Sequence, residues 1–114
     1  MLSLREFLYH ILDEVNYVLK HTDNLTENNF LEDETLTRAV VRSLEIIGEA
    51  TKKLPADFKD KYPHVEWKKM AGVRDVLIHD YFGVDWEIVW DIIKTKLPQL
   101  KEDINEIIKD IKDA

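Results

Sequence analysis

Apolar residues recur at the spacing of amphipathic helices along most of the chain. Within residues 3–21 they stand three or four positions apart, as in Leu4, Leu8, Ile11, Val15 and Val18. Positions at that interval gather on one face of a helix. Ser3 and Glu6 also have the spacing of a capping box, which starts a helix. We therefore expect a first helix from about Ser3 to His21.

Two further helical segments follow in the middle of the chain. Residues 21–29 (HTDNLTENN) are polar and predict a loop. A second helix, marked by apolar residues from Leu36 to Ile47, should end at Leu54 because Pro55 cannot continue it. Residues 55–63 have room for two helical turns at most. We expect a third helix from Trp67 to about His79, with Gly83 as its stop.

The last third of the chain continues the same pattern. Asp85 is placed to cap a fourth helix that carries Trp86, Val89, Trp90, Ile93 and Leu97. Pro98 either kinks that helix or opens a fifth, in which apolar residues continue to Ile111. Strand-like alternation is absent from the sequence. The pattern predicts an all-α fold, an antiparallel bundle of four to five helices in one domain over residues 1–114.

Several of the apolar stripes are wider than one contact face requires. Adjacent apolar pairs occur at residues 40–41, 46–47 and 107–108. Small bundles with such helices often bury the surplus against a second copy. We therefore expect a homodimer.

The composition supports a helical protein and limits its chemistry. The 114 residues are 45% hydrophobic and 34% charged, with three glycines and three prolines. Without cysteine, disulfides and thiolate metal sites are excluded, which favours a cytoplasmic location. Since no apolar run approaches about 20 residues, we expect no membrane span. The N-terminus mixes charged and apolar residues, unlike a signal peptide.

The net charge of −7 argues against a non-specific nucleic-acid binder, but it is unevenly spread. Residues 51–74 hold seven basic and three acidic side chains, a local net of +4. Local fields steer anionic ligands more than totals do. Lys68 and Lys69 are the candidates for this role, although a solvated lysine-rich surface would give the same pattern.

Polar and ionisable residues concentrate in residues 72–83, GVRDVLIHDYFG. On a helix, Asp75 and His79 share a face, so the carboxylate could orient the imidazole. Arg74 and His79 lie about 140° apart around the axis. Both could contact one phosphate if the arginine wraps round, if the helix loosens near Asp80, or if a second subunit contributes. Alternatively, Arg74 and Asp75 are surface charges, and His79 and Tyr81 pack in the core.

Other candidate sites are weaker. His10 and Glu14 have metal-ligand spacing on a helix, but the sequence supplies no obvious third ligand. The chain has no glycine-rich phosphate loop and no nucleophile motif around a serine. The three tryptophans are expected in the core.

Arg74, His79 and Tyr81 form the pattern R-x4-H-x-Y. In the same chain stand RSLEIIGEATKKLP (42–55), WKKMAGVRD (67–75) and VDWEIVWDIIKTKLPQL (84–100). In order and separation these segments resemble HEPN-domain ribonucleases, specifically the HepT-like toxins of prokaryotes. The resemblance covers nearly the whole chain.

That resemblance implies a HEPN-like helical fold, a homodimer and a composite cleft containing both copies of the motif. It implies a metal-independent RNA endonuclease without a cofactor, with Arg74 and His79 as catalytic residues. It also implies a minimal nucleotidyltransferase as antitoxin, which adds AMP to Tyr81. The family often has asparagine after the arginine. Here that residue is Asp75, for which we expect an orienting role toward His79.

The residue types suit that chemistry independently of the resemblance. Histidine can act as a base near neutral pH, and a guanidinium binds phosphate oxygens through two parallel hydrogen bonds. The same cationic residues would also fit a non-catalytic subunit that binds nucleotide and docks a nucleotidyltransferase. A purely structural dimerisation bundle is a third interpretation.

Overall fold

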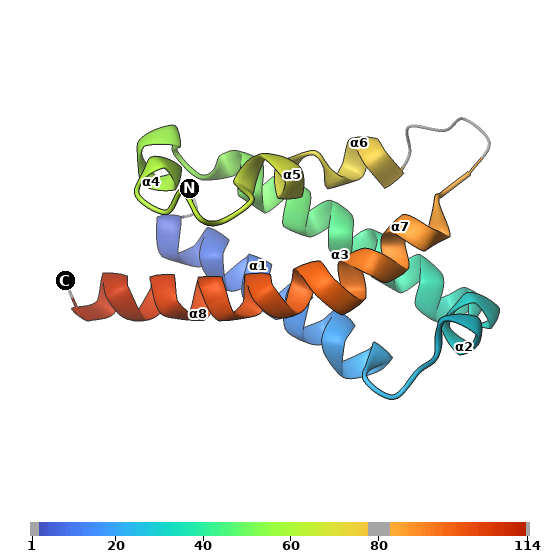
Figure 1. The fold of residues 1–114 in the computed structure, drawn as a ribbon. Coiled ribbons are helices and arrows are strands. Elements are labelled where there is room, and N and C mark those ends of the chain that lie inside the picture. Colours follow the sequence, from blue (N-terminus) through green and yellow to red (C-terminus); the bar gives the residue numbers. More distant parts are fainter. Residues whose placement is uncertain (1–2, 78–82, 114) are drawn as a thin grey trace.

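A computed structural model describes residues 3–77 and 83–113, with the backbone alone for Arg74, Val76 and Asp113 (Figure 1). Within these ranges the chain forms helices and no strand. The elements are α1 (Leu4–Thr22), α2 (Glu27–Glu32), α3 (Glu34–Lys53), α4 (Ala56–Asp60), α5 (Trp67–Ala71), α6 (Val73–Leu77), α7 (Trp86–Asp91), the π-helix η1 (Ile92–Lys96) and α8 (Leu97–Asp113). The predicted all-α bundle is confirmed.

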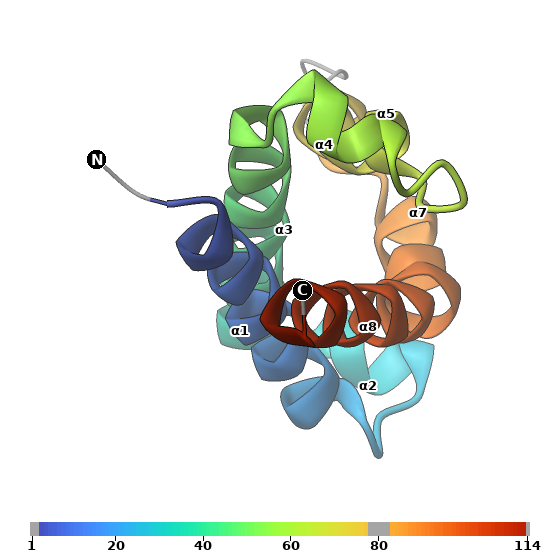
Figure 2. The same cartoon turned by 90° about the vertical axis from the view of Figure 1, so that its left-hand side faces the viewer.

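Three long helices, α1, α3 and α8, form the frame of the bundle. Both α3 and α8 pack on α1, and α5 and α6 pack on α3. Seen from one end, α1 and α3 form one side, α4 and α5 close the top, and α7 lies opposite α3 (Figure 2). The short helices α4, α5 and α7 therefore complete the bundle on the side away from α1, whereas α2 lies below α8 in this view.

Side-chain caps start the helices where the sequence predicts them. Ser3 Oγ accepts a hydrogen bond from the Glu6 backbone N–H at 3.2 Å, and Asp85 Oδ1 accepts one from Ile88 N–H at 3.2 Å. Such caps satisfy amide groups that have no partner within the helix. The expected starts of α1 and α7 are confirmed, as is the end of α3 directly before Leu54 and Pro55.

A short helix, α2, interrupts the loop expected over residues 21–29. Thr26 caps it by accepting a hydrogen bond from Asn29 N–H at 3.1 Å. Its one buried side chain is Phe30, whose ring lies 5.5 Å from the ring of Trp90 and 6.1 Å from that of Trp86. The loop prediction was wrong for the start of α2, because six residues with one buried anchor show no helical period.

The expected third helix is divided at Gly72 into α5 and α6. The Gly72 N–H donates back to the carbonyls of Lys68 and Met70, ending α5. A Cβ at this position would lie 3.4 Å from the Lys68 carbonyl oxygen, at the near limit of ordinary van der Waals contact. Glycine also favours helix ends over interiors. The prediction of one continuous helix from Trp67 was therefore wrong, and its last residues, Ile78 and His79, lie outside the described residues.

Pro98 is accommodated by a π-helical turn in the residues before it. The Leu97 N–H donates to the carbonyl of Ile92, five residues back. In a regular α-helix the Pro98 ring would clash with the carbonyl four residues earlier. The π turn widens the helix at this point, so α7, η1 and α8 follow one another without a loop.

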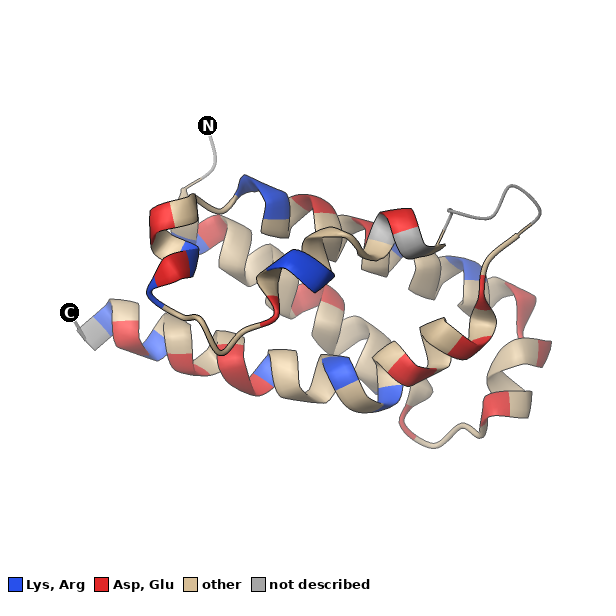
Figure 3. Ribbon diagram, turned by 45° about the horizontal axis from the view of Figure 1, so that its top comes forward, with Lys and Arg blue, Asp and Glu red and all other residues tan. Residues whose placement is uncertain are grey.

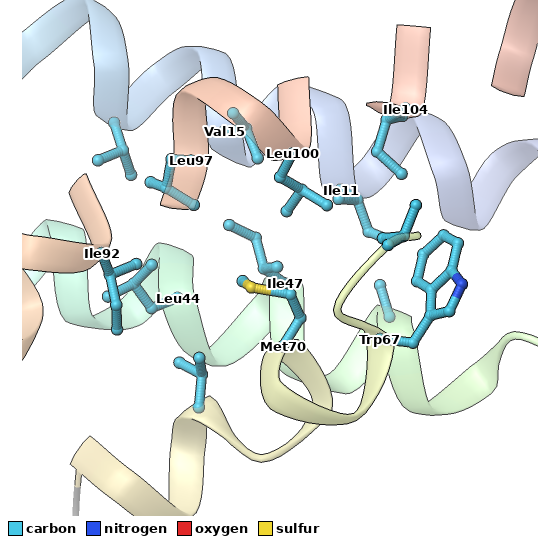
Figure 4. Packing of buried hydrophobic residues seen from close by; sticks show 14 of the residues in the cluster. Ile11, Val15, Leu44, Ile47, Trp67, Met70, Ile92, Leu97, Leu100 and Ile104 are labelled. Carbon is cyan, nitrogen blue, oxygen red and sulfur yellow. The ribbon is translucent and has the colours of Figure 1, made fainter. Parts of the chain in front are cut away.

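Apolar side chains from all sides of the bundle meet in one core (Figure 4). Trp67 and Met70 on α5 point toward residues of α3 and α8, including Ile47 and Leu100 (Figure 4). The indole N–H of Trp67 donates to the carbonyl of Tyr62 at 3.0 Å, so its polar atom is satisfied. This packing fixes α5, and with it the start of α6.

The structure accounts for part of the surplus apolar surface within one chain. Ile107 and Ile108 are both buried against the chain's own core, so this pair does not call for a second copy. On α3, by contrast, Val41 and Ile46 are only half-buried. The homodimer remains a prediction, and α3 carries the residual apolar pairs that favour it.

Phe30→Ala tests whether α2 is docked as described. Because Phe30 is fully buried, the substitution should lower the free energy of unfolding by about 3–5 kcal/mol. Its neighbour Leu31 is 42% exposed, so Leu31→Ala should change stability far less, by roughly 0.5 kcal/mol. Urea denaturation followed by circular dichroism measures both. Equal losses in the two variants would contradict the docking.

Candidate functional site

Two buried residues hold α6 against the bundle. Val73 and Leu77 stand four positions apart and are 5% and 1% exposed. Both belong to the hydrophobic core, and α6 packs on α3. Asp75 lies midway between them and is exposed. The backbone of Arg74 therefore lies in a short helix whose position is set by its apolar neighbours.

The remaining motif residues, His79 and Tyr81, lie outside the described residues, as does Asp80 between them. The proposed orientation of His79 by Asp75 thus stays a prediction, as does the role of Tyr81. The structure places the two ends of this segment: α6 precedes it and α7 follows it (Figure 1).

The two lysines predicted to steer RNA differ in their surroundings. Both lie on α5 and are exposed. Lys69 Nζ lies 2.7 Å from Glu66 Oε2, whereas no carboxylate in the described parts of the chain lies within 4.0 Å of Lys68 Nζ. Lys68 can therefore attract an anionic ligand with its full charge, while the charge of Lys69 is largely neutralised.

Glu66 joins two segments that are far apart in the sequence. Its second oxygen, Oε1, lies 3.1 Å from Lys96 Nζ at the end of η1. Hydrogen bonds from Lys69 and then Lys96 lower the pKa of Glu66, and the bond to Glu66 raises the pKa of Lys69. The three charges link the start of α5 to η1 across the surface.

A groove of about 1060 Å³ runs between α5 and the α7–η1 segment. Trp67, Met70 and Gly72 line one wall, and Ile88 and Ile92 line the other. Ile88 is 38% exposed, so this wall presents apolar surface to solvent. Since Gly72 directly precedes α6, the groove begins beside the helix that carries Arg74. Its lining combines these apolar residues with basic ones, including Lys68, Lys69 and Lys96, and with acidic ones, including Glu66 and Asp91.

The described residues offer no cluster for a metal ion. Among residues 3–77 and 83–113, three or more histidine and carboxylate groups nowhere come together in a ligating arrangement. His10 and Glu14 thus have no third ligand beside them in this part of the chain. None of its helices has the length and apolar character needed to cross a bilayer.

Comparison with known proteins assigns the family. The model of the family described as "Ribonuclease HepT-like" matches residues 11–107. The chain belongs to the HepT-like ribonuclease family. The match includes α6, the motif segment and both walls of the groove.

Curated HepT-like relatives align with the chain along nearly its full length. "Putative RNase MJ0127" of Methanocaldococcus jannaschii is 51% identical over 109 residues, covering 96% of this chain and 90% of its own. "Putative RNase TTE0752" of Caldanaerobacter subterraneus is 45% identical, covering 96% and 97%. "Probable ribonuclease HepT" of Thermococcus cleftensis is 39% identical, covering 94% and 97%. No solved structure gives a significant match.

Sequence reasoning missed the link from Glu66 to Lys96. Glu66 and Lys69 are three residues apart, a spacing at which ion pairs form on a helix. The ion pair between these two residues could therefore have been predicted from the sequence. Lys96 lies 30 residues further on and meets Glu66 only through the fold.

Glu66→Gln tests the link through its pH dependence. The pKa of Glu66 is lowered below its ordinary value of 4.5, so ionised Glu66 stabilises the folded state. This contribution is present above pH 4.5 and is lost as the pH falls through the lowered pKa. Glu66→Gln should therefore be less stable than wild type at pH 7, with the difference shrinking in acid.

Urea denaturation at pH 7 and at about pH 3 measures this difference. Glu87→Gln, an exposed carboxylate on α7 without an ion pair among the described residues, is the matched control. A loss of stability for Glu66→Gln that is the same at both pH values would contradict the link.

Proposed function

We propose that this chain is an RNA endonuclease that acts as the toxin of a toxin–antitoxin pair. The observation that carries the proposal is the R-x4-H-x-Y motif of Arg74, His79 and Tyr81 in a chain of the HepT-like ribonuclease family. Its relatives' names, which describe ribonucleases, support the same activity.

The proposed reaction needs no metal ion. His79 accepts the proton of a ribose 2′-hydroxyl, whose oxygen then attacks the adjacent phosphorus. The bond from phosphorus to the 5′-oxygen breaks, and the departing oxygen takes up a proton. The products are a 2′,3′-cyclic phosphate and a 5′-hydroxyl end. Arg74 stabilises the charge that develops on the phosphate oxygens through paired hydrogen bonds.

A second copy of the chain completes the proposed site. On one regular helix, Arg74 and His79 would lie about 140° apart and could not easily contact one phosphate. In a homodimer, Arg74 of one copy and His79 of the other can meet at the interface. Half-buried apolar residues on α3 and the exposed Ile88 in the groove beside α6 support an interface of this kind.

Asp75 would act on the site through His79 rather than on RNA. An exposed carboxylate next to a phosphate repels it unless the charge is paired. His79 lies four positions after Asp75, a spacing at which the carboxylate can hold the imidazole in one tautomer on a helix. Lys68, which has no ion pair among the described residues, offsets the acidic charge on the approach to α6.

The proposed antitoxin is a minimal nucleotidyltransferase that transfers AMP from ATP to the Tyr81 hydroxyl, releasing pyrophosphate. The added group brings bulk and negative charge to the place where an anionic substrate must bind. Steric exclusion and charge repulsion would then both silence the toxin.

Arg74→Ala and His79→Ala should each reduce RNA cleavage on the order of 10²-fold or more, because each removes one element of the chemistry. Cleavage by the wild-type protein should persist in EDTA. A gel assay with labelled RNA and purified protein measures both effects, and the same variants should relieve growth arrest on expression.

Arg5→Ala and His10→Ala, which alter exposed residues of α1, are the matched controls and should leave cleavage unchanged. Continued cleavage or toxicity in the Arg74→Ala/His79→Ala double variant would overturn the assignment. A wild-type protein that binds nucleotide but leaves RNA intact would instead show a non-catalytic docking subunit.

Co-expression with the nucleotidyltransferase tests the modification. Mass spectrometry should find AMP on Tyr81, and Tyr81→Phe should remove the modification because the accepting hydroxyl is gone. Tyr17→Phe, at an exposed tyrosine of α1, should not. If Tyr81 stays unmodified in a neutralised complex, inhibition works by occlusion alone.

A further inference from the structure

A second groove lies where the end of α1 meets η1 and the start of α8. It has a volume of about 670 Å³, within the range of ligand-binding clefts. Three lysines from three different elements line it: Lys20 of α1, Lys94 of η1 and Lys101 of α8. Asp23 is its one acidic lining residue. In a chain with a net charge of −7, such a concentration of basic side chains is unexpected.

None of the three lysines is neutralised by a carboxylate among the described residues. All three side chains are exposed, and no Asp or Glu oxygen in those ranges lies within 4.0 Å of their Nζ atoms. Lys69 and Lys96 differ in this respect, because the ammonium groups of both form ion pairs with the Glu66 carboxylate. Lys20, Lys94 and Lys101 are therefore available to a ligand.

Lys94 is held toward the groove by two contacts that leave its charge in place. Its Nζ lies 4.7 Å from the centre of the Trp90 ring and 3.5 Å from the carbonyl oxygen of Thr22 at the end of α1. Lys94 lies within the π turn, a kind of distortion often found at functional sites.

The charge of the groove lining remains positive after its one carboxylate and the end of α1 are counted. The end of α1 contributes about half a negative charge through its free carbonyls. Asp23 contributes one more, against three lysines. Figure 3 shows basic segments where η1 joins α8, whereas acidic segments dominate α2 and α7. A polyanion near the protein is therefore drawn to this groove and repelled from much of the remaining surface.

We propose that this groove binds the sugar–phosphate backbone of the RNA substrate at a distance from the reacting linkage. The proposal rests on the RNA endonuclease function above and adds a second contact region for the same strand. Lysine ammonium groups bind phosphates as point charges without reading sequence. The groove would therefore strengthen binding of RNA without selecting its sequence.

The lining favours RNA over an acidic protein partner. Protein interfaces are centred on exposed aromatic or apolar anchors. Here Ile93 is 1% exposed and belongs to the core, Leu19 is only half-buried, and Pro98 is exposed, so the groove has no aromatic anchor and little large apolar surface. The groove instead presents the amide of Asn16 and three ammonium groups, which suit phosphate and ribose oxygens.

The test compares two triple variants, each made in the full-length His79→Ala protein so that RNA is not cut. The first carries Lys20→Gln, Lys94→Gln and Lys101→Gln. The second, a control of equal charge change, carries Lys61→Gln, Lys109→Gln and Lys112→Gln. Lys109 and Lys112 lie on α8 beyond the groove, and Lys61 directly follows α4. All three are exposed and have no ion pair among the described residues. Fluorescence anisotropy with a labelled single-stranded RNA gives the affinity at several salt concentrations.

Losing three phosphate contacts should reduce the slope of log affinity against log salt by about 2 in the groove variant. The ratio of the RNA affinity of the His79→Ala parent to that of this variant should therefore fall roughly 20-fold as the salt concentration rises from 50 to 200 mM. The control triple should keep the parent's slope.

Equal slopes for the groove variant and the control would overturn the proposal. So would unchanged RNA binding combined with lost capture of the cognate nucleotidyltransferase, since the groove would then bind a protein. Either result leaves the endonuclease function standing if the protein with intact His79 cuts RNA. A chain that neither cuts nor binds RNA would overturn both proposals.

Discussion

The docking of α6 through Val73 and Leu77 is the interaction on which the candidate site depends. Burying side chains of this kind stabilises a structure by about 1.5–3 kcal/mol each, so these two residues determine which side of α6 faces α3. Asp75, midway between them, is consequently exposed. The break at Gly72 separates α6 from α5, so the helix that carries the motif arginine is positioned by its own anchors. The exposed position of Asp75 keeps its carboxylate out of the core, where an unpaired charge would be costly.

Pairing between charges, rather than their number, decides which lysines can serve an anionic substrate. Residues 51–74 are rich in lysine, yet Lys69 is bonded to Glu66, as is Lys96 from η1. Lys68, by contrast, has no ion pair within residues 3–77 and 83–113. A net charge of −7 hides such local differences, because a substrate responds to the field within about one Debye length of the surface. The acidic total is therefore compatible with a protein that binds RNA at selected places.

Helix positions that depend only on residues close together in the chain could be predicted from the sequence. The long helices follow from apolar spacing, and the starts at Ser3 and Asp85 follow from capping. Helix α2 could not be predicted because its single anchor, Phe30, gains its stability from Trp90, 60 residues away. For the candidate site, the motif residues come directly from the sequence pattern. The contact of Lys94 with the Thr22 carbonyl joins residues that are 72 positions apart, and Lys94 lies in the π turn. No local sequence pattern predicts that turn.

Mixing two inactive variants tests most directly whether the site is shared between two copies of the chain. Arg74→Ala and His79→Ala subunits, differently tagged, are co-expressed, and the mixed dimer is isolated by sequential affinity purification. If Arg74 of one copy works with His79 of the other, the mixed dimer retains one intact pairing and recovers RNA cleavage up to about half the wild-type rate. If the mixed dimer forms but stays as inactive as its parents, the shared site is wrong.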